Sequence, residues 1–240
     1  MKIFLLTPLF FIGTLSAQEA EEKPTVSSEE AIRQSSLALG YQEGIRTSRK
    51  QMRTEDINTD AYLEGFLRGL KGQKISLSPE EIRDAMTLLQ AKITAREIDT
   101  AEANLQAAKE FLQAKESKEG IIKNDSGLLY RVVKAGEGEP FGEEGLFGKE
   151  ILVNYRGTLP DGTEFATSGE LTPAIIQLDD VITGFREALL KMRKGDKWVA
   201  FVPSELAYGD QRRSSEIGPN QLLIFEIELV EVRAIPLPTE

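Results

Sequence analysis

The 240-residue sequence contains no cysteine and no histidine. Without cysteine, the chain has no disulfide, no thiolate nucleophile and no cysteine-bound zinc site. Without histidine, it lacks the commonest general base at neutral pH, and with it the histidine-dependent triads and metal sites. Any catalysis must use carboxylates, hydroxyls, lysine, backbone dipoles or a shaped apolar pocket. We therefore expect no bound metal and no other cofactor.

Basic residues are also in short supply. The 29 lysines and arginines stand against 39 aspartates and glutamates, which gives a net charge of −10 at pH 7. This charge repels a nucleic-acid backbone, so we expect no nucleic-acid partner. Acidic pairs such as Glu143 and Glu144 are typical of a solvated surface rather than of metal ligands. The hydrophobic content of 40% is ordinary for a folded globular protein.

A nearly unbroken apolar run occurs only at the N-terminus. Lys2 precedes an apolar segment, residues 3–15, and Ala17 offers a small residue before a cleavage point. This pattern predicts a signal peptide over residues 1–17 and export to a bacterial periplasm. A buried N-terminal helix is the alternative for the segment, and secretion or association with the outer membrane is the alternative destination. The run is shorter than the roughly 20 residues of a membrane-spanning helix, so we expect no membrane span.

Residues 26–119 carry the signals of an all-α domain, after a polar stretch, residues 18–25, that is predicted to be disordered. Ser27 followed by Glu30 is the pattern of a capping box at the start of a first helix. Thr59 and Asp60 are candidate caps of a short second helix. That helix contains glycines, so tertiary contacts must stabilise it.

The strongest local prediction is a long helix over residues 79–118. Ser78 is placed to cap it, Pro79 occupies the first helical position and Glu81 completes a capping box. At 1.5 Å per residue the helix is about 60 Å long, so it supports another helix pair or bridges two domains. Its apolar residues recur with a heptad-like spacing that shifts phase once: Ile82, Met86, Leu89 and Ile93, then Ile98, Ala101, Leu105, Ala108 and Leu112.

From about residue 120 the pattern changes to that of strands. Residues 128–133, 151–159 and 197–202 are predicted strands, and alternation from Leu223 to Val230 predicts a strand with one buried face. Pro160, Asp161 and Gly162 form a hairpin-turn sequence. A short amphipathic helix is expected at residues 184–192. Antiparallel strands with one short helix predict a compact α+β domain over residues 120–240.

Several stretches of this second half occur together, in a characteristic order and spacing: VNYRG at 153–157, DGTEF at 161–165, VITGF at 181–185, VPSELAYG at 202–209, and IGPN at 217–220 leading into LIF at 223–225. In them the chain resembles the FKBP-type peptidyl-prolyl cis/trans isomerases. The resemblance implies an FKBP-like antiparallel sheet wrapped around a short helix.

The first half resembles the N-terminal domain of the macrophage-infectivity-potentiator, or Mip-like, subfamily. The matching parts are GYQEG at 40–44, the segment 66–72, the long helix and SGLLY at 126–130. In that subfamily the N-terminal helices dimerise, and the long helix holds each isomerase domain away from the dimer core. The resemblance therefore implies a homodimer formed through residues 26–119.

The FKBP resemblance also implies a pocket for a proline ring. Phe185 forms its floor, the Ile182 backbone N–H donates to the substrate carbonyl, and the Tyr208 hydroxyl binds a carbonyl at the rim. Rotation of an X-Pro bond breaks no covalent bond, so a chain without histidine or cysteine can catalyse it. The implied catalytic residues are Tyr155, Phe165, Ile182, Phe185, Tyr208 and Phe225, and the implied substrate-binding residues are Val181, Ile217 and Ala166.

Three positions depart from the family pattern. Ala166 stands where an aspartate is usual, Ala174 where an aromatic residue is common, and Phe185 where tryptophan is common. These changes imply weakened binding of macrolide inhibitors and lower or differently selective activity. Phe225, Tyr155 and Phe165 also have a simpler interpretation as core aromatic residues.

The sequence thus favours an isomerase that assists the folding of exported proteins and acts on their proline-containing unfolded or nascent chains. Two alternatives remain open at this point. One is an FKBP-like binding or chaperone module with negligible turnover, and the other is a dimeric helical spacer that displays an inert domain.

Overall fold

The computed structural model describes residues 27–169 and 172–235. The predicted signal peptide, residues 1–17, and the predicted disordered segment, residues 18–25, lie outside the described residues. The chain divides into two compact units, residues 1–47 and 48–240. Within the described ranges, none of the helices combines the length and apolarity that crossing a bilayer requires.

Helix α1 (Ser28–Ser48) makes up nearly all of the described part of the first unit. Its start confirms one half of the predicted capping box, because the Glu30 backbone N–H donates to the Ser27 hydroxyl at 3.2 Å. The helix buries none of its residues, and both Leu37 and Leu39 are exposed. Propensity alone stabilises a helix of this length poorly in water, so α1 requires packing contacts along its apolar side chains.

Helix α2 (Thr59–Leu70) is capped one residue earlier than predicted. The Asn58 side chain accepts a hydrogen bond from the Ala61 backbone N–H at 2.9 Å, and Thr59 is the first helical residue. The expectation of a cap at Thr59 or Asp60 was therefore wrong. Asparagine, aspartate and threonine are all good caps, so a run of them leaves the starting residue ambiguous in sequence.

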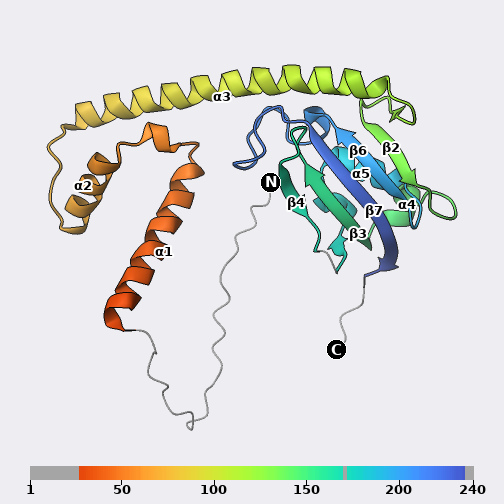
Figure 1. Ribbon diagram of the computed structural model, residues 1–240, viewed down its shortest axis with the longest axis horizontal. Coiled ribbons are helices and arrows are strands. Elements are labelled where there is room, and N and C mark those ends of the chain that lie inside the picture. The colour runs from red at the N-terminus through yellow and green to blue at the C-terminus, as the bar shows by residue number, and fades with distance from the viewer. Residues whose placement is uncertain (1–26, 170–171, 236–240) are drawn as a thin grey trace, which may run out of the picture. The chain divides into compact units, whose positions relative to one another are not determined.

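Helix α3 (Pro79–Glu116) confirms the predicted start and ends two residues before the predicted end (Figure 1). The Ser78 backbone N–H donates to the Glu81 carboxylate at 2.7 Å, and the Glu81 N–H donates to the Ser78 hydroxyl at 3.2 Å. These bonds lower the pKa of Glu81. At 1.5 Å per residue, 38 residues give a helix about 57 Å long.

The N-terminal half of α3 is fastened to the turn η1 (Thr54–Asp56) by a buried carboxylate. The Asp56 side chain has no solvent exposure and lies 2.9 Å from both Lys92 Nζ and Arg96 Nη2. The Arg96 guanidinium, followed by the Arg53 backbone N–H and Lys92, holds the pKa of Asp56 far below its usual value. The carboxylate is therefore ionised at neutral pH, and the pairing persists until strongly acidic conditions.

A single antiparallel sheet follows α3, with the strand order β1-β2-β6-β7-β3-β4 and with β5 also paired to β3. The longest pairing joins β3 to β7 and runs from Lys149 opposite Ala234 to Thr158 opposite Ile224. The strands are β1 (Ile122–Lys123), β2 (Leu129–Lys134), β3 (Lys149–Thr158), β4 (Glu164–Thr167), β5 (Ala174–Ile176), β6 (Lys197–Val202) and β7 (Leu223–Ala234).

The core of this part lies between the sheet and helix α5 (Thr183–Lys191). The helix buries Phe185, Ala188 and Leu189. On β7 the alternating residues Leu223, Phe225, Ile227 and Leu229 are all buried, as the sequence pattern predicts. Figure 1 shows α5 behind the long strands β3, β7 and β6. This arrangement confirms the α+β prediction of N-terminal helices followed by an antiparallel sheet around a short helix.

The predicted hairpin turn is confirmed between β3 and β4. The Leu159 N–H donates to the Thr163 carbonyl at 2.8 Å, and Gly162 takes the left-handed conformation with φ +90°. The Asp161 carboxylate accepts from the Thr163 N–H at 2.9 Å, which lowers the pKa of Asp161. The turn therefore fixes the register in which β4 returns along β3.

Several short elements have no clear sequence signal. No prediction was made for the strands β1, β4 and β5. The same holds for helix α4 (Gly142–Leu146) and for the turns η2 (Leu178–Asp180) and η3 (Ser204–Leu206). Each is only two to five residues long, which is too short for a hydrophobic period to be recognised in the sequence. Tertiary pairing, and not local propensity, determines their conformation.

Asp196, immediately before β6, has a buried carboxylate. It accepts hydrogen bonds from the Gly136 N–H at 2.5 Å and from the Arg193 N–H at 2.7 Å. We predict that Asp196→Ala lowers the free energy of unfolding by about 2–4 kcal/mol, because it leaves two backbone donors without an acceptor. Urea denaturation followed by far-UV circular dichroism measures the change. Asp125→Ala, at an exposed position, is the matched control, and equal midpoints for the two variants would contradict the prediction.

Candidate functional site

Four aromatic rings from four different elements form a continuous group. The ring centroids of Tyr155 (β3) and Phe185 (α5) lie 5.9 Å apart, those of Phe185 and Phe225 (β7) 5.1 Å apart, and those of Phe165 (β4) and Phe225 5.5 Å apart. All three contacts are edge-to-face, with interplanar angles of 82–89°. This geometry suits the charge distribution of aromatic rings. We call these four residues the aromatic cluster.

The four rings of the aromatic cluster differ in their exposure to solvent. Phe185 and Phe225 are buried, whereas Tyr155 and Phe165 are half-buried. Phe185 and Phe225 therefore gain the full contribution of apolar burial, whereas Tyr155 and Phe165 gain only part of it. The partial exposure of two rings leaves apolar surface that a ligand can cover.

The backbone of β3 makes room for this cluster at Gly157. Gly157 pairs with Ala166 on one side and with Phe225 on the other. A Cβ at this position would lie 2.7 Å from two ring atoms of Phe165 and 3.2 Å from the ring of Phe225. Only glycine therefore lets the Phe165 ring lie across β3 and meet Phe225. This role of Gly157 was not predicted from the sequence, although a glycine within a strand can indicate such close packing.

Most of the other predicted site residues pack on the same apolar core. Val181, Ile182 and Tyr208 are half-buried against it, and Ile217 is one of its buried members. Ala166 is half-buried beside Phe165 on β4 and is not among the described residues that form this core or pack on it. Eight of the nine predicted residues thus belong to one apolar core or pack against it, and Ala166 does not.

Ile182 presents a backbone donor beside the cluster. It is the N-cap of α5 with extended backbone angles, φ −64° and ψ 154°, and its carbonyl accepts from the Arg186 N–H at 3.0 Å. Among the described residues, no group accepts a hydrogen bond from the Ile182 N–H. A donor in this position is one of the unsatisfied N–H groups that every helix start leaves for another partner.

Tyr208 contributes a hydroxyl group and packs against the same apolar core. It follows η3, whose turn is closed by a hydrogen bond from the Gly209 N–H to the Ser204 carbonyl at 2.8 Å. The guanidinium of Arg213 lies over the Tyr208 ring, 5.5 Å from its centroid. Within the described ranges no side chain or backbone group bonds to the Tyr208 hydroxyl, so it is available to a ligand carbonyl.

Ion pairs hold the segments that flank Val181 and Ile182. Arg186 on α5 lies 3.2 Å from the Asp179 carboxylate of η2 and 2.6 Å from the Glu143 carboxylate of α4. These pairs connect three short elements around the start of α5. They are partly exposed, so each pair adds little to the stability of the fold.

Two residues of the site were not singled out from the sequence. Leu206 and Ala207 are half-buried and pack against the apolar core beside Tyr208. They lie in the stretch 202–209 that resembles the FKBP family, but aliphatic side chains in a loop carry no signal that separates a site contact from ordinary packing. Ala174 on β5, noted as a departure, also packs there.

The arrangement determines which chemistry is possible. It offers an apolar aromatic surface, one backbone donor and one hydroxyl. No three His, Cys, Asp or Glu side chains in the described ranges are grouped to hold a metal ion. Such a site can bind a proline ring and orient the carbonyls on either side of it. It is suited to a reaction that needs no nucleophile and no proton transfer.

Comparison with known proteins agrees with this geometry. A family model described as FKBP-type peptidyl-prolyl cis-trans isomerase matches residues 144–230. A second model, described as the domain amino terminal to FKBP-type peptidyl-prolyl isomerase, matches residues 32–132. The two matches together span both halves of the chain.

Individual relatives match over most of their length. The outer membrane protein MIP of Legionella longbeachae is 39% identical over 183 residues, which are 74% of this chain and 77% of that protein. The peptidyl-prolyl cis-trans isomerase Mip of Coxiella burnetii is 31% identical over 236 residues, 95% of this chain and 98% of that protein. The crystal structure of FkpA from Escherichia coli superposes with a TM-score of 0.59 at 28% identity and covers 88% of this chain and 99% of that one.

The sequence matches, the sheet around α5 and the aromatic cluster lead to one conclusion. The chain belongs to the FKBP-type peptidyl-prolyl cis-trans isomerases, and within them to the Mip-like group, in which a helical domain precedes the isomerase domain.

Proposed function

We propose that this isomerase acts on X-Pro bonds of exported proteins while they fold, and that the proline ring binds on the aromatic cluster. The observation that carries the proposal is the chain of three edge-to-face ring contacts at 5.1–5.9 Å, with two rings partly open to solvent. Unfolded and nascent exported chains are its substrates, because their X-Pro bonds populate both isomers and interconvert in tens to hundreds of seconds.

The catalytic task is to stabilise a twisted amide. The barrier of about 20 kcal/mol comes from the resonance that is lost when the amide leaves planarity. In this proposal Phe185 and Phe225 form the floor under the proline ring, and Tyr155 and Phe165 cover its sides. The twisted amide is less delocalised and less polar than the planar one, so an apolar surface favours it over the ground state. A thousandfold acceleration requires about 4 kcal/mol of such differential binding.

Two polar groups orient the substrate. The Ile182 N–H donates to the carbonyl of the substrate, and the Tyr208 hydroxyl donates to a second carbonyl at the edge of the site. Both donors lack a partner within the described residues, which supports these roles. Val181 and Ile217 contribute apolar contacts to the residues around the proline. Ala166 offers only a methyl group beside Phe165.

The small residues of the site point to weak macrolide binding. Ala174 packs on the apolar core with a single methyl group, and Phe185 has no indole N–H. In a site with an aromatic residue at position 174 and tryptophan at position 185, a large inhibitor would gain more apolar contact and one more hydrogen bond than it gains here. The same changes keep the second candidate function open, a binding module with negligible turnover.

We predict that the full-length enzyme accelerates cis/trans exchange in a short X-Pro peptide. Phe185→Leu is expected to lower this activity more than tenfold, because it removes the central ring while it retains most of the buried volume. Tyr208→Phe is expected to lower it several-fold, because only the hydroxyl is lost. Exchange spectroscopy on the peptide measures both effects, and far-UV circular dichroism checks the fold.

Phe147→Leu is the matched control for Phe185→Leu, since Phe147 is 62% exposed and lies outside the aromatic cluster. Wild-type turnover in both site variants would show that the site is misplaced. A wild-type chain without turnover that still suppresses aggregation of a proline-free client would favour the binding module instead.

We also infer that the protein is exported to the periplasm and works as a homodimer. One relative is named an outer membrane protein, and the N-terminal residues 1–17 have the composition of a signal peptide.

The exposed face of α2 supports the homodimer. On α2, the apolar residues Leu63, Phe66 and Leu70 are 53%, 51% and 71% exposed. A contiguous apolar face of this kind is typical of an interface. A second copy of residues 26–119 is the partner that the Mip-like family implies.

We predict that the full-length chain sediments as a dimer and that residues 120–240 alone sediment as a monomer. Phe66→Asp is expected to shift the full-length chain toward monomer, because it places a charge within the exposed apolar face of α2. Val133→Asp is the control, since Val133 is 54% exposed but lies on β2. A monomeric wild-type chain in sedimentation velocity would remove the dimer from the proposal.

A further inference from the structure

The segment that follows Tyr208 forms a compact loop, residues 209–220. The Asn220 N–H donates to the Gly209 carbonyl at 2.8 Å and closes the loop at its base. Within it, the Arg213 N–H donates to the Ile217 carbonyl at 2.9 Å, and the Ile217 N–H donates to the Ser214 hydroxyl at 3.0 Å. We call this segment the site loop, because Ile217 belongs to the apolar core that contains Phe185 and Phe225, and the Arg213 guanidinium lies over the Tyr208 ring.

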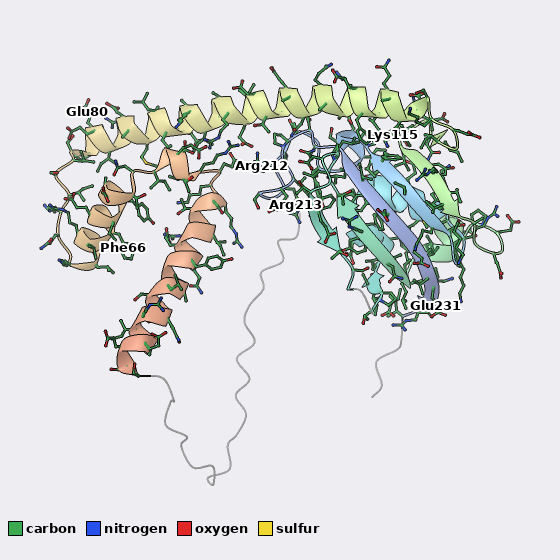
Figure 2. The ribbon with its side chains drawn as sticks, viewed as in Figure 1. Phe66, Glu80, Lys115, Arg212, Arg213 and Glu231 are labelled. Carbon is green, nitrogen blue, oxygen red and sulfur yellow. The ribbon has the colours of Figure 1, made fainter. Side chains whose placement is uncertain are left out.

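The site loop lies against the middle of α3, as Figure 2 shows for the labelled Arg212 and Arg213. The Arg212 guanidinium makes a bidentate ion pair with Glu97, with Nε–Oε2 and Nη2–Oε1 distances of 2.8 and 3.1 Å. Both side chains are mostly buried. A two-point contact of this kind fixes the orientation of the arginine as well as its position.

Two amide side chains make a second connection. The Asn104 side-chain NH2 donates to the Pro219 carbonyl at 2.8 Å, and the Asn220 side-chain NH2 donates to the Ala101 carbonyl at 3.2 Å. Gly218 permits this approach, because a Cβ there would lie only 3.0 Å from Asn104 Nδ2. The backbone of the site loop therefore rests directly on the helix.

All these contacts come from one face of α3. Glu97, Ala101 and Asn104 are spaced four and three residues apart, so their side chains lie in one row along the helix. Their partners in the site loop are Arg212, which precedes Arg213, and Pro219 and Asn220, which follow Ile217 by two and three residues. Any displacement of the loop from α3 therefore moves Ile217 within the apolar core and moves Arg213 relative to the Tyr208 ring.

We propose that α3 holds the site loop in its binding conformation, and that Glu97 and Asn104 are positioning residues for substrate binding. The proposal rests on the proposed function of the aromatic cluster. The physical effect is pre-organisation: contacts with α3 order the loop when the protein folds, so a substrate does not have to order it on binding. Residues from the helical part of the chain thereby determine affinity at a site that they do not touch.

The test uses the full-length chain and a short X-Pro peptide. Asn104→Ala, Glu97→Ala and the double variant are expected to raise KM about three- to tenfold and to leave kcat within about twofold, because the aromatic cluster itself is unchanged. A purely structural role would lower the fraction of folded enzyme, which lowers the apparent kcat at constant KM. Gln106→Ala is the control, since Gln106 is exposed on α3 and its side chain donates to Glu110 of the same helix.

A charge reversal provides the rescue. Glu97→Arg alone is expected to raise KM at least as much as Glu97→Ala, because it places two guanidinium groups together. Combining it with Arg212→Glu restores the ion pair with opposite polarity and is expected to return KM to within about twofold of the wild-type value. A double variant no better than Glu97→Arg alone would count against the ion pair as the positioning contact.

Hydrogen exchange of the site-loop amides separates this proposal from the proposed function. In the Asn104→Ala, Glu97→Ala double variant, the amides of Arg213 and Asn220 are expected to exchange about tenfold faster, with the amides of β3 and β7 unchanged. Unchanged loop exchange together with unchanged KM would overturn the proposal. A wild-type chain that does not turn over the peptide would overturn the proposed function, and the exchange result would then decide on the helix contact alone.

Discussion

The site depends on the mutual packing of four aromatic rings, and this packing depends on a missing side chain. Phe165 meets Phe225 because Gly157 leaves the space above β3 open. Phe225 in turn supports Phe185, whose ring edge meets Tyr155. Each ring is held by its neighbour at close to a right angle, so rotation of one ring disturbs the next. The reaction needs a fixed apolar surface and no reactive group, and the sheet provides that surface by positioning rings.

The same aromatic residues contribute to the proposed site and to the stability of the fold. Phe185 and Phe225 are at once members of the buried core and the floor of the proposed site. Their replacement by small residues costs both packing and binding, which is why a volume-conserving change is needed to separate the two effects. Tyr155 and Tyr208 are half-buried, so they contribute more to the ligand surface than to the core. The absence of cysteine and histidine carries no cost for such an enzyme.

Features that depend only on residues close together in sequence were predicted correctly. The capping box of Ser78 and Glu81, the turn around Gly162 and the alternation along β7 are all complete within a few residues, and the structure has each of them. Predictions that required knowledge of partners did less well. Ile98 continues the apolar spacing of α3 and yet is exposed, whereas the neighbouring Glu97 pairs with Arg212 of the site loop. The rings were named from family resemblance, since the sequence alone leaves them as ordinary core aromatics.

The contact between Glu97 and Arg212 illustrates why part of the site is invisible in sequence. The residues are 115 positions apart, and in a chain with 68 charged side chains many other pairs are equally plausible. Only the fold brings the middle of α3 to the loop that carries Ile217. The proposed positioning role gives α3 a function beyond connecting the helical part of the chain to the sheet. A helix that only connected two domains would present water-solvated polar residues along its middle. Here a mostly buried carboxylate and a half-buried amide of α3 instead bind the site loop.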